Sequence, residues 1–206
     1  MSAVLEPPVT WAGSVAHAVA EVRAGRIVVL FDDAADEGVL VHAAAAATPH
    51  TVAAMVRHTS GLLRAAMTAA DLDRLAIPPM VPRHHGSGSR FAVAVDAAAG
   101  VTTGISATDR ARTFRILADP ASVPGDLIRP GHVIPERVAP GGVLERPCRA
   151  EAAVELTARA GVAPVAVIGE LADDTGTVPG WAGSVAFARE HRLPLVTIGN
   201  LVPFVP

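Results

Sequence analysis

The pattern of apolar and polar positions along the chain predicts helices alternating with short strands. Between residues 14 and 24, Val15, Val19 and Val22 fall on one helical face, with Ser14 placed to cap the helix and Gly25 to end it. Similar patterns predict helices over 51–58, 68–77, 107–118, 149–160 and 182–192. Apolar runs, alternating in one case, predict strands over 26–31, 39–45, 62–67, 90–97, 163–171 and 193–199.

This alternation indicates a mixed α/β (α+β) protein built as a single layered domain over residues 1–206. Residues 1–12 are expected to form a loosely ordered N-terminal segment. Residues 119–146 are rich in Pro and Gly, and we interpret them as one long irregular loop. Compact domains usually keep loops of that length for function.

Composition removes several classes of partner. A net charge of -3 and an aromatic content of 3% disfavour nucleic acid, which is held by clustered positive charge and stacking side chains. No apolar stretch reaches the roughly 20 residues that span a membrane. The start of the chain has no basic segment followed by an apolar one, and the single cysteine offers no disulfide framework. We therefore expect a cytoplasmic protein with no nucleic-acid or membrane partner.

The basic residues narrow the possible chemistry further. All 17 are arginine, because the sequence contains no lysine. Mechanisms that need a lysine Schiff base, a pyridoxal-phosphate lysine or a P-loop lysine are excluded. One cysteine, Cys148, likewise excludes the Cys-rich zinc sites.

Three polar segments are candidates for a functional site: the acidic loop 32–37, the loop 83–89 and the long loop that includes 129–132 and 141–151. Each also has an ordinary explanation, such as a solvated turn or a loop histidine bonded to backbone. The adjacent residues His84 and His85 do not form a paired metal site, because neighbours in an extended segment point to opposite sides. Glu170 stands out, since it ends an apolar run where a buried carboxylate is costly unless paired.

Seven segments resemble the 3,4-dihydroxy-2-butanone 4-phosphate synthase family, in register from about Glu21 to the C-terminus. They are RHTSG (57–61), GVTTGISATDR (100–110), DLIRPGHVIP (126–135), GGVLER (141–146), EAAVELTARAG (151–161), GELADDTG (169–176) and LVTIGNLV (195–202). The resemblance implies that family's fold and a homodimer with sites near the subunit interface. It also implies the conversion of ribulose 5-phosphate to a four-carbon ketone phosphate and formate, with magnesium as cofactor.

Two segments depart from the family pattern at its metal ligands. Ala35 stands where the acidic loop of the family has its metal-binding glutamate, and Arg149 where the second loop has its metal-binding histidine. Ala34 replaces a substrate-binding arginine, whereas Arg146 matches the family's phosphate-binding arginine. An arginine side chain stays protonated and does not ligate magnesium.

From these departures we expect a diverged homologue, a lyase or isomerase that acts on a small anionic metabolite without a metal or other cofactor. The candidate catalytic residues are His132, Glu170 and Glu37. The candidate substrate-binding residues are Arg146, Arg149, Thr103, Ser60, His84 and His85.

Two alternatives stay open. One is the usual family activity, with magnesium held in a rearranged site by Asp33, Asp36 and Glu37, since carboxylates are suitable magnesium ligands. The other is a protein that keeps the fold but binds a ligand or partner without catalysis.

Overall fold

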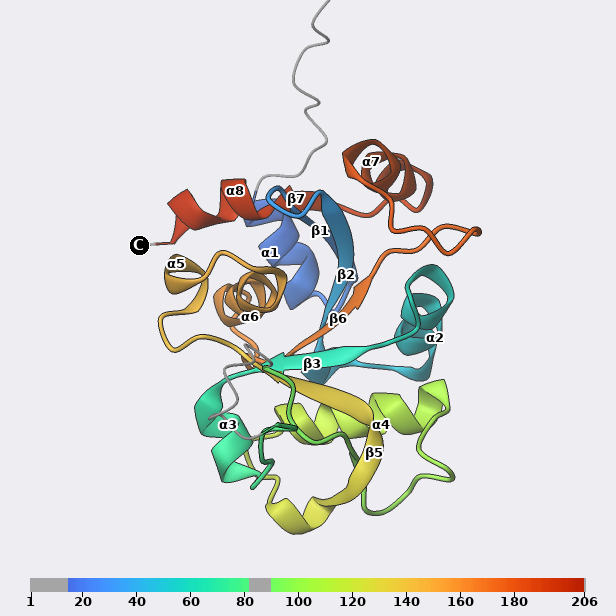
Figure 1. Ribbon diagram of the computed structural model, residues 1–206, viewed down its shortest axis with the longest axis vertical. Helices are drawn as coiled ribbons and strands as arrows, with labels where there is room; N and C mark the ends of the chain where they lie inside the picture. Colours follow the sequence, from blue (N-terminus) through green and yellow to red (C-terminus); the bar gives the residue numbers. More distant parts are fainter. Residues whose placement is uncertain (1–14, 82–89, 206) are drawn as a thin grey trace, which may run out of the picture.

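The computed structural model describes residues 15–81 and 90–205, and its strands form one seven-stranded mixed sheet with helices on both faces (Figure 1). The strand order is β4-β5-β3-β6-β2-β1-β7. The strands are β1 (Val28–Asp32), β2 (Glu37–Ala43), β3 (Arg64–Met67), β4 (Val95–Ala97), β5 (Leu127–Arg137), β6 (Ala166–Glu170) and β7 (Leu195–Thr197). The α-helices are α1 (Val15–Arg23), α2 (Pro49–His58), α3 (Ala69–Arg74), α4 (Ala107–Ala118), α5 (Gly142–Glu145), α6 (Arg149–Arg159), α7 (Trp181–Glu190) and α8 (Ile198–Leu201).

The sheet separates two hydrophobic cores, which explains why its central strands are apolar on both sides. In β1, Val29 and Phe31 point into the core that contains residues of α2, α3 and α4. Val28 and Leu30 point into the other core, with residues of α1, α6 and α8. Successive side chains of a strand face opposite sides of a sheet, so a strand covered on both faces becomes a continuous apolar run.

The predicted mixed α/β class is confirmed, and most elements lie within a few residues of their predicted bounds. Helix α4 begins after Ser106, whose hydroxyl accepts a hydrogen bond from the Asp109 N–H at 3.0 Å, as its sequence predicts. The predicted strand over 90–97 is too long, because only Val95–Ala97 forms β4.

The prediction that residues 119–146 form one irregular loop is wrong. That stretch contains β5, the longest strand, and the short helix α5. Pro and Gly within residues 127–137 suggested a loop, but β5 is held by partners distant in sequence, with β3 on one side and β4 on the other. Long-range strand pairing therefore overrides the local propensity of these residues.

Several of the candidate site residues lie where the β1–β2 hairpin, the end of β6 and the start of α6 meet. Asp32 pairs with Glu37 across the hairpin, and Val39 pairs with Glu170 of β6. Asp32 and Glu37 each lie two residues from a side chain that points toward α6, Leu30 and Val39 respectively. The twofold strand period therefore places these carboxylates on the face that α6 covers.

Two further expectations concern the ends and loops of the chain and a possible membrane span. The expected loose segment 1–12, together with His84 and His85, lies outside the described residues. Among the residues that are described, no helix combines the length and the apolar composition needed to cross a bilayer.

Candidate functional site

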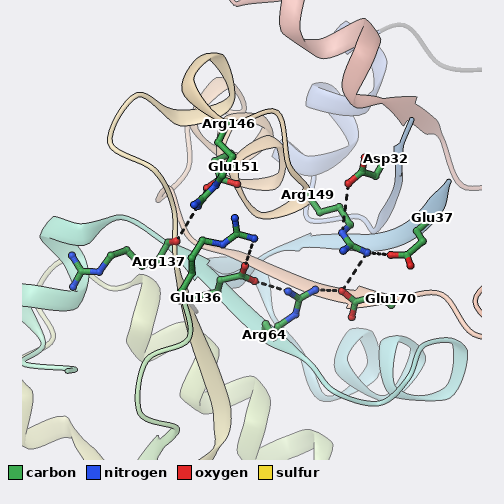
Figure 2. Close-up of polar contacts among 10 residues, drawn as sticks. Asp32, Glu37, Arg64, Glu136, Arg137, Arg146, Arg149, Glu151 and Glu170 are labelled. Atoms are coloured by element: carbon green, nitrogen blue, oxygen red, sulfur yellow. Dashed lines mark hydrogen bonds and ion pairs between the residues drawn. The ribbon is translucent and has the colours of Figure 1, made fainter. Parts of the chain in front are cut away.

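Three carboxylates from separate elements converge on the guanidinium of Arg149, the first residue of α6 (Figure 2). Nη1 donates a hydrogen bond to Glu37 Oε2 and lies 3.8 Å from Glu170 Oε1. Nε lies 3.7 Å from Asp32 Oδ2. The Arg149 side chain is 27% exposed, so this single cation faces the three carboxylates at the edge of solvent.

This arrangement does not fit a bound divalent cation. The point on which Asp32, Glu37 and Glu170 converge is filled by a guanidinium, which has five donors and no acceptor. Within residues 15–81 and 90–205, no group of three or more His, Cys, Asp or Glu side chains is arranged to hold a metal ion. We therefore derive no catalytic step through a metal in this arrangement of side chains.

The three aspartates of the acidic loop accept hydrogen bonds from backbone N–H groups. Asp32 Oδ1 accepts hydrogen bonds from Ala34 N at 3.1 Å and Ala35 N at 3.2 Å, which closes the turn. Asp33 Oδ2 accepts from Gly199 N of α8 at 2.7 Å. Asp36 Oδ1 accepts from Trp181 N of α7 at 3.0 Å. The structure thus does not bring together Asp33, Asp36 and Glu37, the residues considered for a relocated metal.

Arg146 and Arg149, both candidate substrate-binding residues, face different carboxylates. Arg146 Nη2 donates to Glu151 Oε1, and its side chain is 30% exposed. Glu151 is buried, and its Oε1 also accepts from Ala139 N at 2.9 Å. This pair holds the loop before α6 against the helix, while Arg149 points toward the sheet (Figure 2).

Glu170 has a second cationic partner that the sequence analysis missed. Arg64 of β3 donates from Nη2 to Glu170 Oε1 and from Nη1 to Glu136 Oε2, the latter at 2.6 Å. Arg64 is a charged residue inside the apolar run 62–67. The argument that drew attention to Glu170, a charge in a strand that should be buried, would also have found Arg64.

His132 of β5 is oriented by Asp96 of β4. Asp96 Oδ1 accepts from the His132 backbone N–H at 3.0 Å, and Asp96 Oδ2 lies 2.7 Å from His132 Nδ1. Asp96 is 3% exposed, whereas the His132 side chain is 39% exposed. A carboxylate at Nδ1 favours the tautomer with its proton on that nitrogen, which leaves Nε2 free to exchange a proton with a ligand.

Two glycines make this pair possible. A Cβ at Gly104, where φ is +89°, would lie 2.0 Å from Asp96 Oδ2 and 2.8 Å from His132 Nδ1. A Cβ at Gly131 would lie 2.0 Å from the Val95 carbonyl carbon. Both positions therefore require a residue without a side chain, and Asp96 is a further residue that the sequence analysis missed.

The loop beside Gly104 contains Thr103, which is exposed. Asp109 fixes this loop by accepting hydrogen bonds from the Thr102 hydroxyl at 2.7 Å and from Gly104 N at 3.1 Å. The Thr102 hydroxyl, opposed by burial and assisted by backbone N–H groups, keeps the pKa of Asp109 below its usual value. Asp109 therefore stays ionised near neutral pH and holds Thr103 next to the Asp96–His132 pair.

Ser60 lies beside Glu170, in the group of candidate residues around the end of β6. Its backbone N–H donates to the Glu170 carbonyl oxygen at 2.8 Å, and its side chain is exposed to solvent. The structure therefore groups the candidate residues in two places. Ser60, Glu37, Arg149 and Glu170 lie around the end of β6, and Thr103 lies near His132.

Curated relatives match nearly all of this chain but extend beyond it. Riboflavin biosynthesis protein RibBA of Salinispora tropica is 50% identical over 198 residues, which cover 93% of this chain and 49% of the relative. The protein of the same name from Mycobacterium tuberculosis is 46% identical over 194 residues, with 92% and 46% covered. The chain thus spans about half the length of these relatives.

Two solved structures match it over almost their whole length. A 3,4-dihydroxy-2-butanone 4-phosphate synthase of Candida albicans has a TM-score of 0.89 at 34% identity, covering 94% of this chain and 98% of that one. A synthase of the same name, described in complex with two magnesium ions, has a TM-score of 0.87 at 39% identity, covering 94% and 96%. The predicted family fold is confirmed.

These comparisons correct two of our expectations. We expected a metal-independent lyase or isomerase, but relatives at 50% identity are named for riboflavin biosynthesis, which favours the usual family activity. We also expected no cofactor, but the solved synthase at 39% identity binds two magnesium ions. Both expectations took the substitutions at Ala35 and Arg149 as evidence about the reaction, and both are wrong.

The match to a family model completes the assignment. The model described as 3,4-dihydroxy-2-butanone 4-phosphate synthase covers residues 16–204, almost the whole described chain. The seven segments that suggested the resemblance all lie inside this range. The chain therefore belongs to the 3,4-dihydroxy-2-butanone 4-phosphate synthase family.

Proposed function

We propose that this chain converts ribulose 5-phosphate into 3,4-dihydroxy-2-butanone 4-phosphate and formate. The observation that carries the proposal is His132, oriented by the buried carboxylate of Asp96 with Nε2 left free. This pair lies in a chain that is 50% identical to a riboflavin biosynthesis protein. The reaction requires protons to be moved among adjacent carbons of a sugar phosphate, and an oriented histidine suits that task.

We assign proton transfer to His132 and Glu170. His132 Nε2 exchanges a proton with the substrate while Asp96 holds the ring. Glu170 Oε1 accepts a hydrogen bond from Arg64 and lies 3.8 Å from Arg149 Nη1, and within the described residues Oε2 accepts no hydrogen bond. We assign Oε2 to the second proton transfer. Together the two residues provide an acid and a base.

We assign the binding of the anionic substrate to arginine, because phosphate is recognised by guanidinium groups. Arg146 keeps 30% of its side chain exposed beside Glu151, and Arg149 keeps 27% exposed beside Glu37. Thr103 and Ser60 are exposed next to the His132 and Glu170 groups, respectively, and can donate further hydrogen bonds to the sugar. A small sugar phosphate is therefore the substrate class that we assign to this site.

One solved relative is described in complex with two magnesium ions, and a bound magnesium ion would supply Lewis-acid chemistry by polarising substrate oxygen atoms. In this chain the carboxylates that converge are paired with Arg149, so we assign no residue to a metal. The metal requirement is measured directly by supplying or removing magnesium.

The experiment incubates the purified protein with ribulose 5-phosphate, in magnesium and in EDTA, and measures formate. We expect formate in magnesium, and the EDTA arm measures whether the reaction requires the metal. His132→Asn and Glu170→Gln should each lower kcat by about 10²- to 10⁴-fold. His50→Asn and Glu155→Gln, which change the same residue types outside the site, should leave kcat unchanged. No formate from the wild-type protein in either condition would overturn the proposal.

A second candidate function is the binding of a sugar phosphate without turnover. The observation that favours it is the guanidinium of Arg149, which fills the point where three carboxylates converge. Isothermal titration with ribulose 5-phosphate separates the two candidates. Binding without formate supports this second function, and formate rejects it.

We further propose that the chain acts as a homodimer. Three large apolar side chains are exposed on segments that surround His132: Leu62 at 47%, Ile105 at 51% and Ile128 at 49%. Ile128 pairs with Asp96 in the sheet, and Arg110 of α4 donates to the carbonyl oxygen of Gly61 at 3.2 Å. Exposed apolar side chains gathered around a site are typical of an interface.

A further inference from the structure

Arg64 places a buried guanidinium in the middle of the sheet, between two carboxylates (Figure 2). Its side chain is 8% exposed, and that of Glu136 is 2% exposed. Nη1 lies 2.6 Å from Glu136 Oε2, and Nη2 donates to Glu170 Oε1. The planar guanidinium therefore bridges a buried carboxylate and a residue that we assign to proton transfer.

Strand register explains why these three side chains meet. Arg64 of β3 lies opposite Ile134 of β5 on one side and Ile168 of β6 on the other. Glu136 and Glu170 each lie two residues beyond those partners, so all three side chains project from the same face of the sheet. Because β5 runs parallel and β6 antiparallel to β3, Glu136 lies toward one end of β3 and Glu170 toward the other, with Arg64 between them.

Stability alone does not account for this arrangement. Removing charges from water costs more than many buried ion pairs return, and well-packed apolar residues often serve as well or better. Glu136 also has a second cation, since Arg90 Nη2 lies 3.3 Å from its Oε1. The other cation near Glu170 is Arg149, at 3.8 Å, which also contacts Asp32 and Glu37. Arg64 is thus the closer of the two partners of Glu170.

We propose that Arg64 is a positioning residue for the reaction: anchored by Glu136, its guanidinium fixes the Glu170 carboxylate through Oε1 and directs Oε2 toward the substrate. This inference rests on the proposed function, in which Glu170 transfers a proton. A guanidinium presents its donors in a rigid plane, so an anchored one restricts the carboxylate that it contacts. Misplacing a catalytic group by about 1 Å can cost about 10²-fold in rate.

The test compares two variants that differ only at residue 64. Glu136→Leu removes the anchor but keeps Arg64 beside Glu170. The double variant Arg64→Leu/Glu136→Leu removes the whole buried pair, and so avoids leaving Glu136 buried without a partner. Arg159→Leu is the control for losing a half-buried arginine that pairs with a glutamate outside the site. Kinetics with ribulose 5-phosphate and a crystal structure are obtained for each folded variant.

We expect the double variant to lower kcat by about 10²-fold relative to the wild-type protein, with KM within about threefold of the wild-type value. Glu136→Leu, which frees the Arg64 guanidinium from its anchor, should lower kcat by less. We expect the Glu170 carboxylate of the double variant to leave its wild-type position. A purely structural role would lower thermal stability without this separation of kcat from KM. If kcat of the double variant stays within about threefold of the wild-type value, the inference is overturned.

The two proposals fail in different ways. Absence of formate from the wild-type protein overturns the proposed function but leaves the crystal structures as a measure of Arg64. In that case, an unmoved Glu170 carboxylate in the double variant overturns the positioning role. A displaced one shows that Arg64 fixes Glu170 whatever the chain does with it.

Discussion

His42 is a histidine in the interior of the protein, in β2, with no exposed surface. Within the described residues neither of its ring nitrogens has a hydrogen-bond partner. Burial lowers its pKa from 6.5 to about 4, because the charged imidazolium loses its hydration there. The folded protein therefore holds His42 neutral over a pH range in which the unfolded chain binds a proton.

This predicts a loss of stability in acid. Above pH 6.5 both states are neutral at His42, and the residue adds no pH dependence. Between pH 6.5 and about 4 the unfolded chain binds more protons, so the free energy of unfolding falls as the pH falls. The loss amounts to about 3 kcal/mol once the pH is below both pKa values. Urea titrations of the wild-type protein and His42→Leu should show a shallower pH dependence in the variant, with His50→Asn as control.

Asp96 carries a prediction about activity. It accepts hydrogen bonds from both the backbone and the ring of His132, so Asp96→Asn keeps the shape but changes what the ring can donate. Because an aspartate fixes the tautomer of the histidine that it contacts, we expect Asp96→Asn to lower kcat for formate production by about 10²- to 10⁴-fold. Asp126→Asn, an exposed aspartate that caps a turn, is the control. Unchanged kcat in Asp96→Asn would mean that Asp96 has no part in orienting His132.

Helices α7 and α8, in the C-terminal third of the chain, are each joined to the acidic hairpin by a carboxylate. Helix α7 begins after Gly180, which offers no capping side chain. The carboxylate of Asp36, distant in sequence, accepts from the first N–H of that helix. Asp33 accepts in the same way from Gly199 of α8. The hairpin thus joins the β1–β2 turn to two helices that follow more than 140 residues later.

We predict that Asp36→Ala destabilises the protein by about 2 kcal/mol. About half of that comes from the lost helix cap. The rest comes from placing alanine at φ +53°, a backbone conformation that asparagine tolerates better. Asp36→Asn keeps an acceptor oxygen and should lie within about 0.5 kcal/mol of the wild type. Chemical denaturation measures both variants, with the exposed Asp174→Ala as control, and equal losses in Asp36→Ala and Asp36→Asn would reject the cap.

At the scale of the whole molecule, the exposed apolar residues around His132 predict a dimer. Sedimentation of the wild-type protein should give a mass of two 21.0 kDa chains. Ile105→Glu and Ile128→Glu place a charge in the proposed interface and should shift the mass toward one chain. Leu144→Glu, equally exposed on α5, should leave the dimer intact. A wild-type protein that sediments as one chain would contradict the proposal.

How far the sequence predicted the fold depended on whether the determining contacts were local. Helix α4 followed from its capping serine and its helical periodicity, and α6 followed from helical periodicity, both within a few residues of sequence. Strand β5 was missed because Pro130 and Gly131 suggest a loop, while its pairing partners lie far away in the chain. Local patterns contain no information about which distant strand supplies the hydrogen bonds.

The same contrast between local and long-range contacts explains which site residues were predicted. Arg146, Arg149, His132 and Glu170 were found because they lie in motifs or interrupt apolar runs. Their partners were not, since the pairing of Arg146 with Glu151 and of Arg149 with Glu37 depends on how separate elements pack. The expectation about the metal failed for a different reason. The residue types at two metal-ligand positions do not by themselves determine which reaction a family member catalyses.

The row of alternating charges that runs from Arg90 through Glu136, Arg64, Glu170 and Arg149 to Glu37 has a consequence for mutational scanning. Each member shares a partner with the next, so the effect of one substitution depends on which others are present. Scores from single substitutions cannot be summed along this row. A library that varies neighbouring pairs is the appropriate design, and epistasis should be concentrated between Arg64 and Glu136.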